Sequence, residues 1–215
     1  MRRCLLVDFD GTLTSRDTTR ALVQNLLRLR PWRFIFIIYG YLRLYIPKRS
    51  HCVQLWKNWC VGKMIQGLSK EDVKQPFEDY ARQVTPWIRS EIISYLYERQ
   101  VAGDRVLIVT ASFELAVAHV LQQHGFAVLG CNFAHNGAIF GDKTYGPECF
   151  GTGKVRRIMD WLEVSGENIV FSEAWSDSLS DIPMMRLAEK QVWVCKKENS
   201  EDFSGIFPNA CFWNY

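Results

Sequence analysis

The sequence predicts an α/β fold, a parallel sheet covered by helices, with a helical cap inserted after the first strand. Two observations carry this prediction. Short runs that are apolar on both faces alternate with helical patterns, as in parallel strands joined by helical crossovers. A long stretch after the first run shows helical patterns and no clear buried strand.

The elements of the sheet layer follow from these runs. The expected strands are Cys4–Phe9, Arg105–Thr110, Asn168–Phe171, Gln191–Cys195 and a weaker Ala127–Cys131. The expected helices are Phe113–His124, Gly153–Leu162 and Ile182–Lys190. The pair Asn136-Gly137, between Cys131–His135 and Ala138–Phe140, predicts a hairpin.

The helical stretch divides the chain into two expected parts. Residues 1–14 and 104–215 form the catalytic core, and residues 15–103 form the cap. The cap helices are expected near Arg16–Leu29, Pro31–Tyr45, His51–Lys63, Ser69–Val84 and Trp87–Gln100. A single α/β domain with extra helices is the alternative.

The first motif is Asp8-Phe9-Asp10-Gly11-Thr12-Leu13-Thr14, where the first strand ends. Residues two apart in an extended segment point to the same side, so Asp8 and Asp10 should both face the crevice at the strand's carboxyl end. Two adjacent carboxylates resist joint ionisation unless a cation lies between them, and Mg²⁺ prefers such oxygen ligands. A solvated Asp-Gly turn is the plainer interpretation.

Two further motifs supply groups for a bound anion. Thr110-Ala111-Ser112 ends another expected strand and precedes a helix, where hydroxyls and free amides bind anions. Lys154 lies at the start of a later helix, where its charge can neutralise a phosphate and a carboxylate. Taken singly, each is also explained as an ordinary helix end.

The fourth motif, Ser176 to Pro183, holds two acids four residues apart after another expected strand. Asp177 is positioned to bind a metal ion directly, and Asp181 to orient a water molecule bound to it. A capped helix start with an early proline is the alternative.

Together the four motifs resemble the haloacid dehalogenase superfamily, in the branch that includes the phosphoserine phosphatases. DFDGTLT, the TAS turn, Lys154 and SDSLSDIPM match that family's motifs in order. The resemblance implies a Rossmann-like sheet with a helical cap after the first strand. This chain has Ser176, Ser178 and Ala111 where phosphoserine phosphatases usually carry glycine, which puts phosphoserine itself in doubt.

The resemblance also implies residue roles. Asp8 would be the nucleophile that forms an aspartyl-phosphate, and Asp10 the general acid and base. Mg²⁺ would be bound by Asp8, Asp10 through its backbone carbonyl, and Asp177, with Asp181 in support. Lys154 would offset phosphoryl charge, and Thr110, Ala111 and Ser112 would hold the phosphoryl oxygens. Asp17 occupies the position of an acid that meets a substrate ammonium group, although it is equally explained as a helix-start acid.

The expected activity is Mg²⁺-dependent hydrolysis of a small phosphorylated metabolite, phosphoserine-like or phosphoethanolamine-like. The main alternative is a phospholipid phosphatase, similar to a phosphatidylglycerophosphatase, at a membrane surface. A phosphosugar mutase and a non-enzymatic phospho-accepting module are less favoured. A dehalogenase is disfavoured because breaking a carbon–halogen bond needs no acid such as Asp10.

Composition narrows the partners. The net charge of +3 and the pI of about 8.5 call for no nucleic acid, and no long basic run is present. Seven scattered cysteines without metal or redox spacing predict reduced thiols. With no recognisable signal peptide, a cytoplasmic protein is expected, and its oligomeric state stays open.

One segment has two interpretations. Phe34 to Leu42 is uncharged and apolar all round, and Arg33 and Arg43 flank it. It is too short to span a membrane, which takes about 20 residues. A buried cap helix is favoured, with an interfacial helix or a dimer contact as alternatives.

Overall fold

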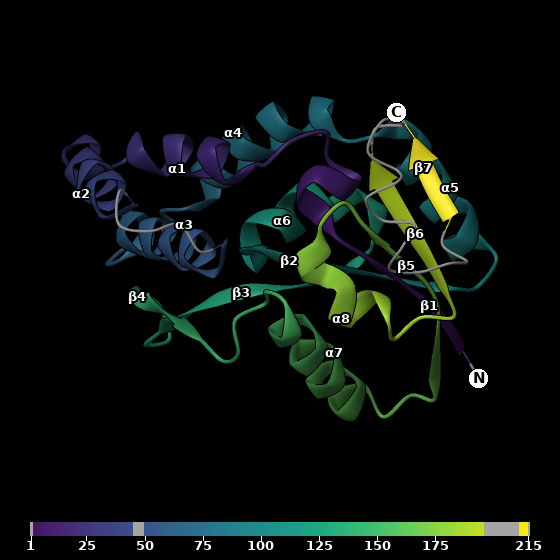
Figure 1. The fold of residues 1–215 in the computed structure, drawn as a ribbon. Coiled ribbons are helices and arrows are strands. Elements are labelled where there is room, and N and C mark those ends of the chain that lie inside the picture. The colour runs from purple at the N-terminus through teal and green to yellow at the C-terminus, as the bar shows by residue number, and fades with distance from the viewer. Residues whose placement is uncertain (1, 45–49, 196–210, 215) are drawn as a thin grey trace.

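The computed structural model describes residues 2–44, 50–195 and 211–214, and its centre is a seven-stranded sheet (Figure 1). The strands are β1 Arg2–Val7, β2 Arg105–Phe113, β3 Ala127–His135, β4 Phe140–Tyr145, β5 Ile169–Ser176, β6 Lys190–Cys195 and β7 Cys211–Asn214. Their order is β4-β3-β2-β1-β5-β6-β7, and all neighbours are parallel except β3 and β4. The predicted parallel sheet is therefore confirmed.

Helices cover both faces of this sheet. Along β1, Cys4 and Leu6 face one apolar cluster, and Leu5 and Val7 face the other, as the period of two requires. The first cluster contains residues of α7, Thr152–Ser165, and α8, Ile182–Met185. The second contains residues of α5, Ser90–Val101, and α6, Glu114–Val120. Because β1 is the central strand, the residues that follow it lie at the carboxyl end of the sheet, midway between its two outer strands.

The cap consists of helices inserted between β1 and α5. They are α1 Thr19–Leu27, α2 Phe34–Leu44, α3 Ser50–Ile65 and α4 Lys74–Val84, with 3-10 turns at Pro31–Arg33 and Thr85–Trp87. Leu22, Met64 and Tyr80 of the cap belong to the same buried cluster as Leu5 of the sheet. The cap is therefore packed onto the core and not held by its linkers alone.

The boundary between core and cap remains a proposal. The sequence prediction of 15–103 for the cap includes α5, yet Tyr95 of α5 donates a hydrogen bond to Glu173 of β5, 2.7 Å away, and stacks against Trp175. Ile92 and Leu96 of the same helix are fully buried. We propose to count α5 with the core, so that the cap ends near Trp87.

The chain enters and leaves the cap at one place. The amide of Ser15 donates to the Trp87 carbonyl at 2.8 Å, and the amide of Arg89 donates to the Leu13 carbonyl at 2.9 Å. The Arg89 guanidinium also donates to the Thr12 carbonyl. These paired linkers fix the cap beside the wide turn, Phe9–Leu13, that follows β1.

Helix α2 is not the fully buried cap helix that the sequence analysis favoured. Phe36 and Ile37 pack against the apolar cluster, and Gly40 is buried against Trp56 of α3. The side chains of Phe34, Ile35, Ile38 and Tyr39, in contrast, are about half exposed. Within the described residues, no helix has the length and apolar character needed to cross a membrane.

Several element ends differ from the sequence predictions. The hairpin at Asn136-Gly137 is confirmed, with Gly137 at φ +82°. The strand expected to end at Phe171 continues to Ser176, because the Glu173 carboxylate inside it is satisfied by Tyr95 and Trp175. The helix expected over Ile182–Lys190 is wrong beyond Met185, since Lys190 already begins β6. Strand β7 was not predicted.

Candidate active site

The site is built where β1 ends. Asp8 is in extended backbone, and the chain then makes the wide turn Phe9–Leu13 with Gly11 at φ +87°, a conformation that favours glycine. The expectation that Asp8 and Asp10 face one crevice is confirmed, since both line a pocket of about 400 Å³. The Asp8 carboxylate is only 6% exposed.

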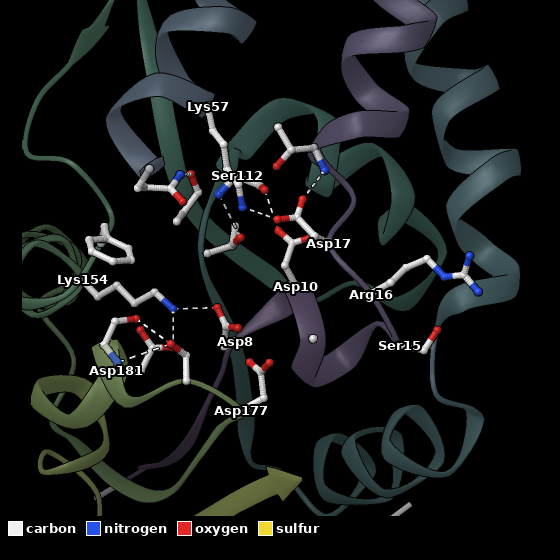
Figure 2. A pocket seen from close by; sticks show the side chains of 18 residues that line it. Asp8, Asp10, Ser15, Arg16, Asp17, Lys57, Ser112, Lys154, Asp177 and Asp181 are labelled. Atoms are coloured by element: carbon white, nitrogen blue, oxygen red, sulfur yellow. Dashed lines mark hydrogen bonds and ion pairs between the residues drawn. The ribbon is translucent and has the colours of Figure 1, made fainter. Parts of the chain in front are cut away.

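Lys154 is the cation that holds the nucleophile candidate. Its ammonium is 2% exposed and donates to Asp8 Oδ1 at 2.6 Å and to Asp181 Oδ2 at 2.8 Å (Figure 2). Burial lowers the pKa of Lys154, but the two carboxylates outweigh it, so the pKa lies above its ordinary value. Burial, together with Asp181 and Asp177, raises the pKa of Asp8, while contact with Lys154 favours the ionised carboxylate that a nucleophile requires.

Asp177 approaches the same turn from the other side. The Thr12 hydroxyl lies 3.1 Å from Asp177 Oδ1 and 3.3 Å from Asp8 Oδ2, so it links the two carboxylates. A Cβ on Gly11 would fall 2.1 Å from Asp177 Oδ2, so only glycine leaves room for this approach. Burial raises the pKa of Asp177 to about 6, the Asp181 charge adds to the rise, and the hydrogen bond with Thr12 limits it.

These residues fit a hard divalent cation. In the part of the chain that the structure describes, no three His, Cys, Asp or Glu side chains gather as a metal site. Two carboxylates, Asp8 and Asp177, nevertheless converge on Thr12, and the Asp10 carbonyl belongs to the same turn. Such a donor set of oxygens, together with waters, is what Mg²⁺ accepts. We propose Asp8, Asp177 and the Asp10 carbonyl as the protein ligands of this cation.

The Asp10 side chain points away from this cluster and toward the cap. Its Oδ1 accepts from the Thr18 amide at 2.7 Å, and its Oδ2 accepts from the Ser112 hydroxyl at 2.6 Å. Burial and the nearby Asp17 raise the pKa of Asp10, and the two hydrogen bonds limit the rise. A carboxyl group with a raised pKa keeps its proton to higher pH, as a general acid must.

The strand expected to end at Thr110 continues to Phe113, so Thr110, Ala111 and Ser112 lie at the end of β2, and they reach the pocket through different groups. Thr110 is fully buried, and its hydroxyl accepts from the Ser112 amide at 3.0 Å. The Ser112 hydroxyl is directed at Asp10, and the Ala111 carbonyl accepts from the cap residue Gln54 at 3.1 Å. These residues therefore connect the general-acid candidate, the sheet and the cap.

Asp181 contacts the lysine and not the turn after β1. Its Oδ2 accepts from Lys154 and also from the Ser176 hydroxyl at 2.7 Å. Its Oδ1 is buried and finds no hydrogen-bond partner among the described residues. That second oxygen is free to accept from a water molecule, as the predicted supporting role requires.

The cap closes the pocket with residues that the sequence analysis did not single out. Gln54 and Lys57 lie three apart on α3 and line the pocket with Asp17 and Arg16. The Lys57 ammonium forms an ion pair with Asp17, and Asp17 Oδ1 also accepts from the Thr19 amide. Burial opposes ionisation of Asp17, but the contacts with Lys57 and Thr19 prevail and lower its pKa. Asp17 is therefore an ionised acid whose charge is already paired.

Comparisons with known proteins agree with this geometry. A family model for haloacid dehalogenase-like hydrolases matches residues 5–186. A histidinol-phosphatase of Neisseria meningitidis is 26% identical over 205 residues, covering 90% of each chain. A protein named "probable phosphatase" from Mycobacterium tuberculosis H37Rv is 24% identical over 198 residues, covering 86% of this chain. The chain spans only 66% of the length of that mycobacterial relative.

Solved structures share the fold. A Bordetella pertussis protein described as of unknown function superimposes with a TM-score of 0.80 at 18% identity, covering 100% of this chain and 99% of the other. A phosphoserine phosphatase solved as an analogue of its phospho-aspartyl intermediate gives 0.61 at 16% identity, with 98% and 92% covered. The family model covers residues 5–186, which is most of the chain, and the four motifs of the sequence converge on one pocket. The chain therefore belongs to the haloacid dehalogenase-like hydrolases.

Proposed function

We propose that this hydrolase is a Mg²⁺-dependent phosphatase that releases phosphate from a small phosphomonoester through an aspartyl-phosphate on Asp8. The observation that carries the proposal is the buried contact of 2.6 Å between the Lys154 ammonium and Asp8 Oδ1 at the end of β1. This contact favours the ionised form of Asp8, in a pocket that the cap residues Gln54 and Lys57 also line. The phosphatases among the relatives support this reaction class.

The residues divide the reaction between them. An Asp8 oxygen attacks phosphorus, and the bond from phosphorus to the leaving oxygen breaks, which gives an acyl-phosphate and an alkoxide. Asp10 donates its proton to that alkoxide and then accepts a proton from the water that hydrolyses the acyl-phosphate. Lys154 offsets the charge on the phosphoryl oxygens and on Asp8.

A divalent cation completes the charge balance. Bound by Asp8, the Asp10 carbonyl and Asp177, Mg²⁺ would neutralise phosphoryl charge. Asp177 and Asp8 then serve as ligands, and Asp181 orients Lys154 and accepts from a water through its second oxygen. We propose these roles from the hydrogen bonds and burial described above.

The substrate is proposed to be a small phosphorylated metabolite, phosphoserine-like or phosphoethanolamine-like. Thr110, Ala111 and Ser112 would contact its phosphoryl group, and Gln54, Lys57 and Asp17 its leaving group. Asp17 is already paired with Lys57, so a substrate ammonium would have to share Asp17 with this lysine or displace it. An anionic group on the leaving group would in the same way have to share Lys57 with Asp17.

A phospholipid phosphatase at a membrane surface is the second candidate. The observation that favours it is the apolar face of α2, which is about half exposed. The other side of α2 packs on α3, the helix whose Gln54 and Lys57 line the pocket. A lipid phosphomonoester could then leave its acyl chains at the surface while its phosphate reaches Asp8.

Asp8→Asn tests the nucleophile. We expect steady-state phosphate release to fall to the contamination level and labelled phosphoryl-enzyme to disappear, because the amide cannot attack phosphorus. Circular dichroism and a cooperative melting curve should show that the variant is folded. Turnover above that level in a folded variant would exclude Asp8 as the nucleophile.

Asp10→Asn tests the general acid. With an alkyl phosphate, the rate of aspartyl-phosphate formation should fall by about 10²- to 10⁴-fold, because the alkoxide leaves unprotonated. With an aryl phosphate, whose leaving group needs little protonation, the same rate should fall far less. Rapid-quench measurement of the first turnover separates this step from hydrolysis, and an equal loss for both substrates would contradict the assignment.

Asp177→Asn tests the metal ligand through stability. The pKa of Asp177 in the folded protein is raised to about 6, so the folded state holds this proton more tightly than the unfolded state. The ionised carboxylate therefore lowers the free energy of unfolding above pH 6, and this loss of stability becomes smaller as the pH falls below 6. Without metal at pH 7.5, the variant should be more stable than wild type by about 1 kcal/mol, and the difference should shrink at pH 5.

Mg²⁺ should raise the melting temperature of wild type and of the control Ser178→Ala, but not of Asp177→Asn. A variant that Mg²⁺ stabilises as well as wild type would rule out the ligand role.

A matched substrate panel separates the two candidates. With Mg²⁺ present, phosphate release is measured for phosphoserine, phosphoethanolamine and glycerol phosphate, and for a lipid phosphomonoester in mixed micelles. We expect kcat/KM to be highest for a soluble compound. A clear preference for the lipid substrate would reverse the order of the candidates, and activity on neither class would contradict the phosphatase assignment.

A further inference from the structure

Helix α2 presents an apolar face to solvent. The exposed fractions are 57% for Ile35 and 50% for Ile38, with Phe34 and Tyr39 similarly open. These positions repeat at intervals of three and four residues, so they form one stripe along the helix. Trp32, 60% exposed in the preceding turn, extends the stripe. We call these five residues, Trp32, Phe34, Ile35, Ile38 and Tyr39, the α2 face.

The opposite side of α2 is fixed to the cap, so the α2 face cannot turn inward without breaking packed contacts. Phe36 makes an edge contact with Trp59 of α3 at 6.1 Å, and Gly40 lies against Trp56. The buried Arg33 guanidinium donates to the Lys63, Met64 and Gln66 carbonyls at the end of α3. Figure 1 shows α2 at the end of the molecule farthest from β7.

The sequence that contains this face is strongly basic. Residues 18–70, which contain α1, α2 and α3, carry ten Lys and Arg and no Asp or Glu. The rest of the chain carries 16 Lys and Arg against all 23 acids. Acids from outside this stretch pair with three of its bases, Arg28 with Asp79, Lys57 with Asp17 and Lys63 with Asp142, which leaves the stretch with a net positive charge. Arg28 still has 69% of its side chain exposed, and Arg20 is also open to solvent. Apolar side chains within a field of positive charge fit an anionic membrane surface better than a neutral partner.

We propose that the α2 face docks the protein onto anionic lipid bilayers, with α2 lying in the interface. At 11 residues the helix is about half the length that a span requires, so it enters the headgroup region sideways. Trp32 and Tyr39 are of the kind found at the depth where water and lipid meet. The net positive charge of residues 18–70 attracts the lipid phosphates, and the apolar stripe then leaves water and enters the headgroup region. The docking involves no catalytic group and does not depend on the proposed reaction.

The test is pelleting of the full chain with sucrose-loaded vesicles. One set holds phosphatidylcholine alone, and the other holds phosphatidylcholine with about one third phosphatidylglycerol. The test variant is Ile35→Glu/Ile38→Glu, which changes two exposed side chains and leaves the packed Phe36 and Ile37 intact. The matched control is Val101→Glu/Val164→Glu, which adds the same charge at two aliphatic positions that are 74% and 88% exposed outside the cap.

The proposal predicts that wild type and the control pellet with anionic vesicles and bind phosphatidylcholine alone much more weakly. The test variant should lose at least about ten-fold in partitioning while its melting temperature stays unchanged. Added salt should weaken binding by wild type. Wild type that stays in the supernatant, or a test variant that binds like the control, would overturn the proposal.

The α2 face could instead bind a second copy of the chain. The same protein samples test for such a dimer. Light scattering during size exclusion should find wild type and the test variant in the same oligomeric state without lipid. A dimeric wild type that Ile35→Glu/Ile38→Glu converts to a monomer would show that the face is a protein interface, and the membrane proposal would fail.

Discussion

The Lys154 ammonium is the group on which the rest of the site depends. It lies on α7, below the sheet edge, and contacts Asp8 after β1 and Asp181 after β5. A single buried charge therefore joins three elements that are distant in sequence. Removing Lys154 would leave the buried Asp8 and Asp181 carboxylates without their cation, a loss that costs about 3 to 5 kcal/mol in comparable cases. The order of the sheet, with β1 between β2 and β5, is what makes these contacts reachable.

The same cluster is a source of instability that the fold offsets elsewhere. Asp8 and Asp177 meet at Thr12, only Asp8 of the two contacts Lys154 among the described residues, and Asp181 keeps a buried oxygen without a partner there. The apolar clusters on both faces of β1 hold these groups in place, since neighbouring Leu5, Leu6 and Val7 are fully buried. An acidic site of this kind gains stability when a cation and an anionic substrate arrive, so binding and folding reinforce each other.

The sequence was most informative where the chemistry is local. The hairpin at Asn136-Gly137, the turn at Gly11 and the meeting of four motifs at strand ends all follow from short patterns. Long-range packing was not readable. Nothing in the pattern of Gln54 and Lys57 indicates that α3 faces the pocket, and nothing in Tyr95 indicates that it satisfies Glu173 in β5. Strand β7 joins the edge of the sheet through pairing with β6, which a four-residue run does not reveal.

Helix α3 connects the pocket with the outer surface of the cap. Gln54 and Lys57 reach the pocket from one side of it, while Trp59 on another side contacts Phe36 and Tyr39 of α2. The same helix therefore contacts both α2 and the pocket. Lys57 lines the crevice together with five aspartates, so its charge offsets part of theirs where a dianionic phosphate would approach.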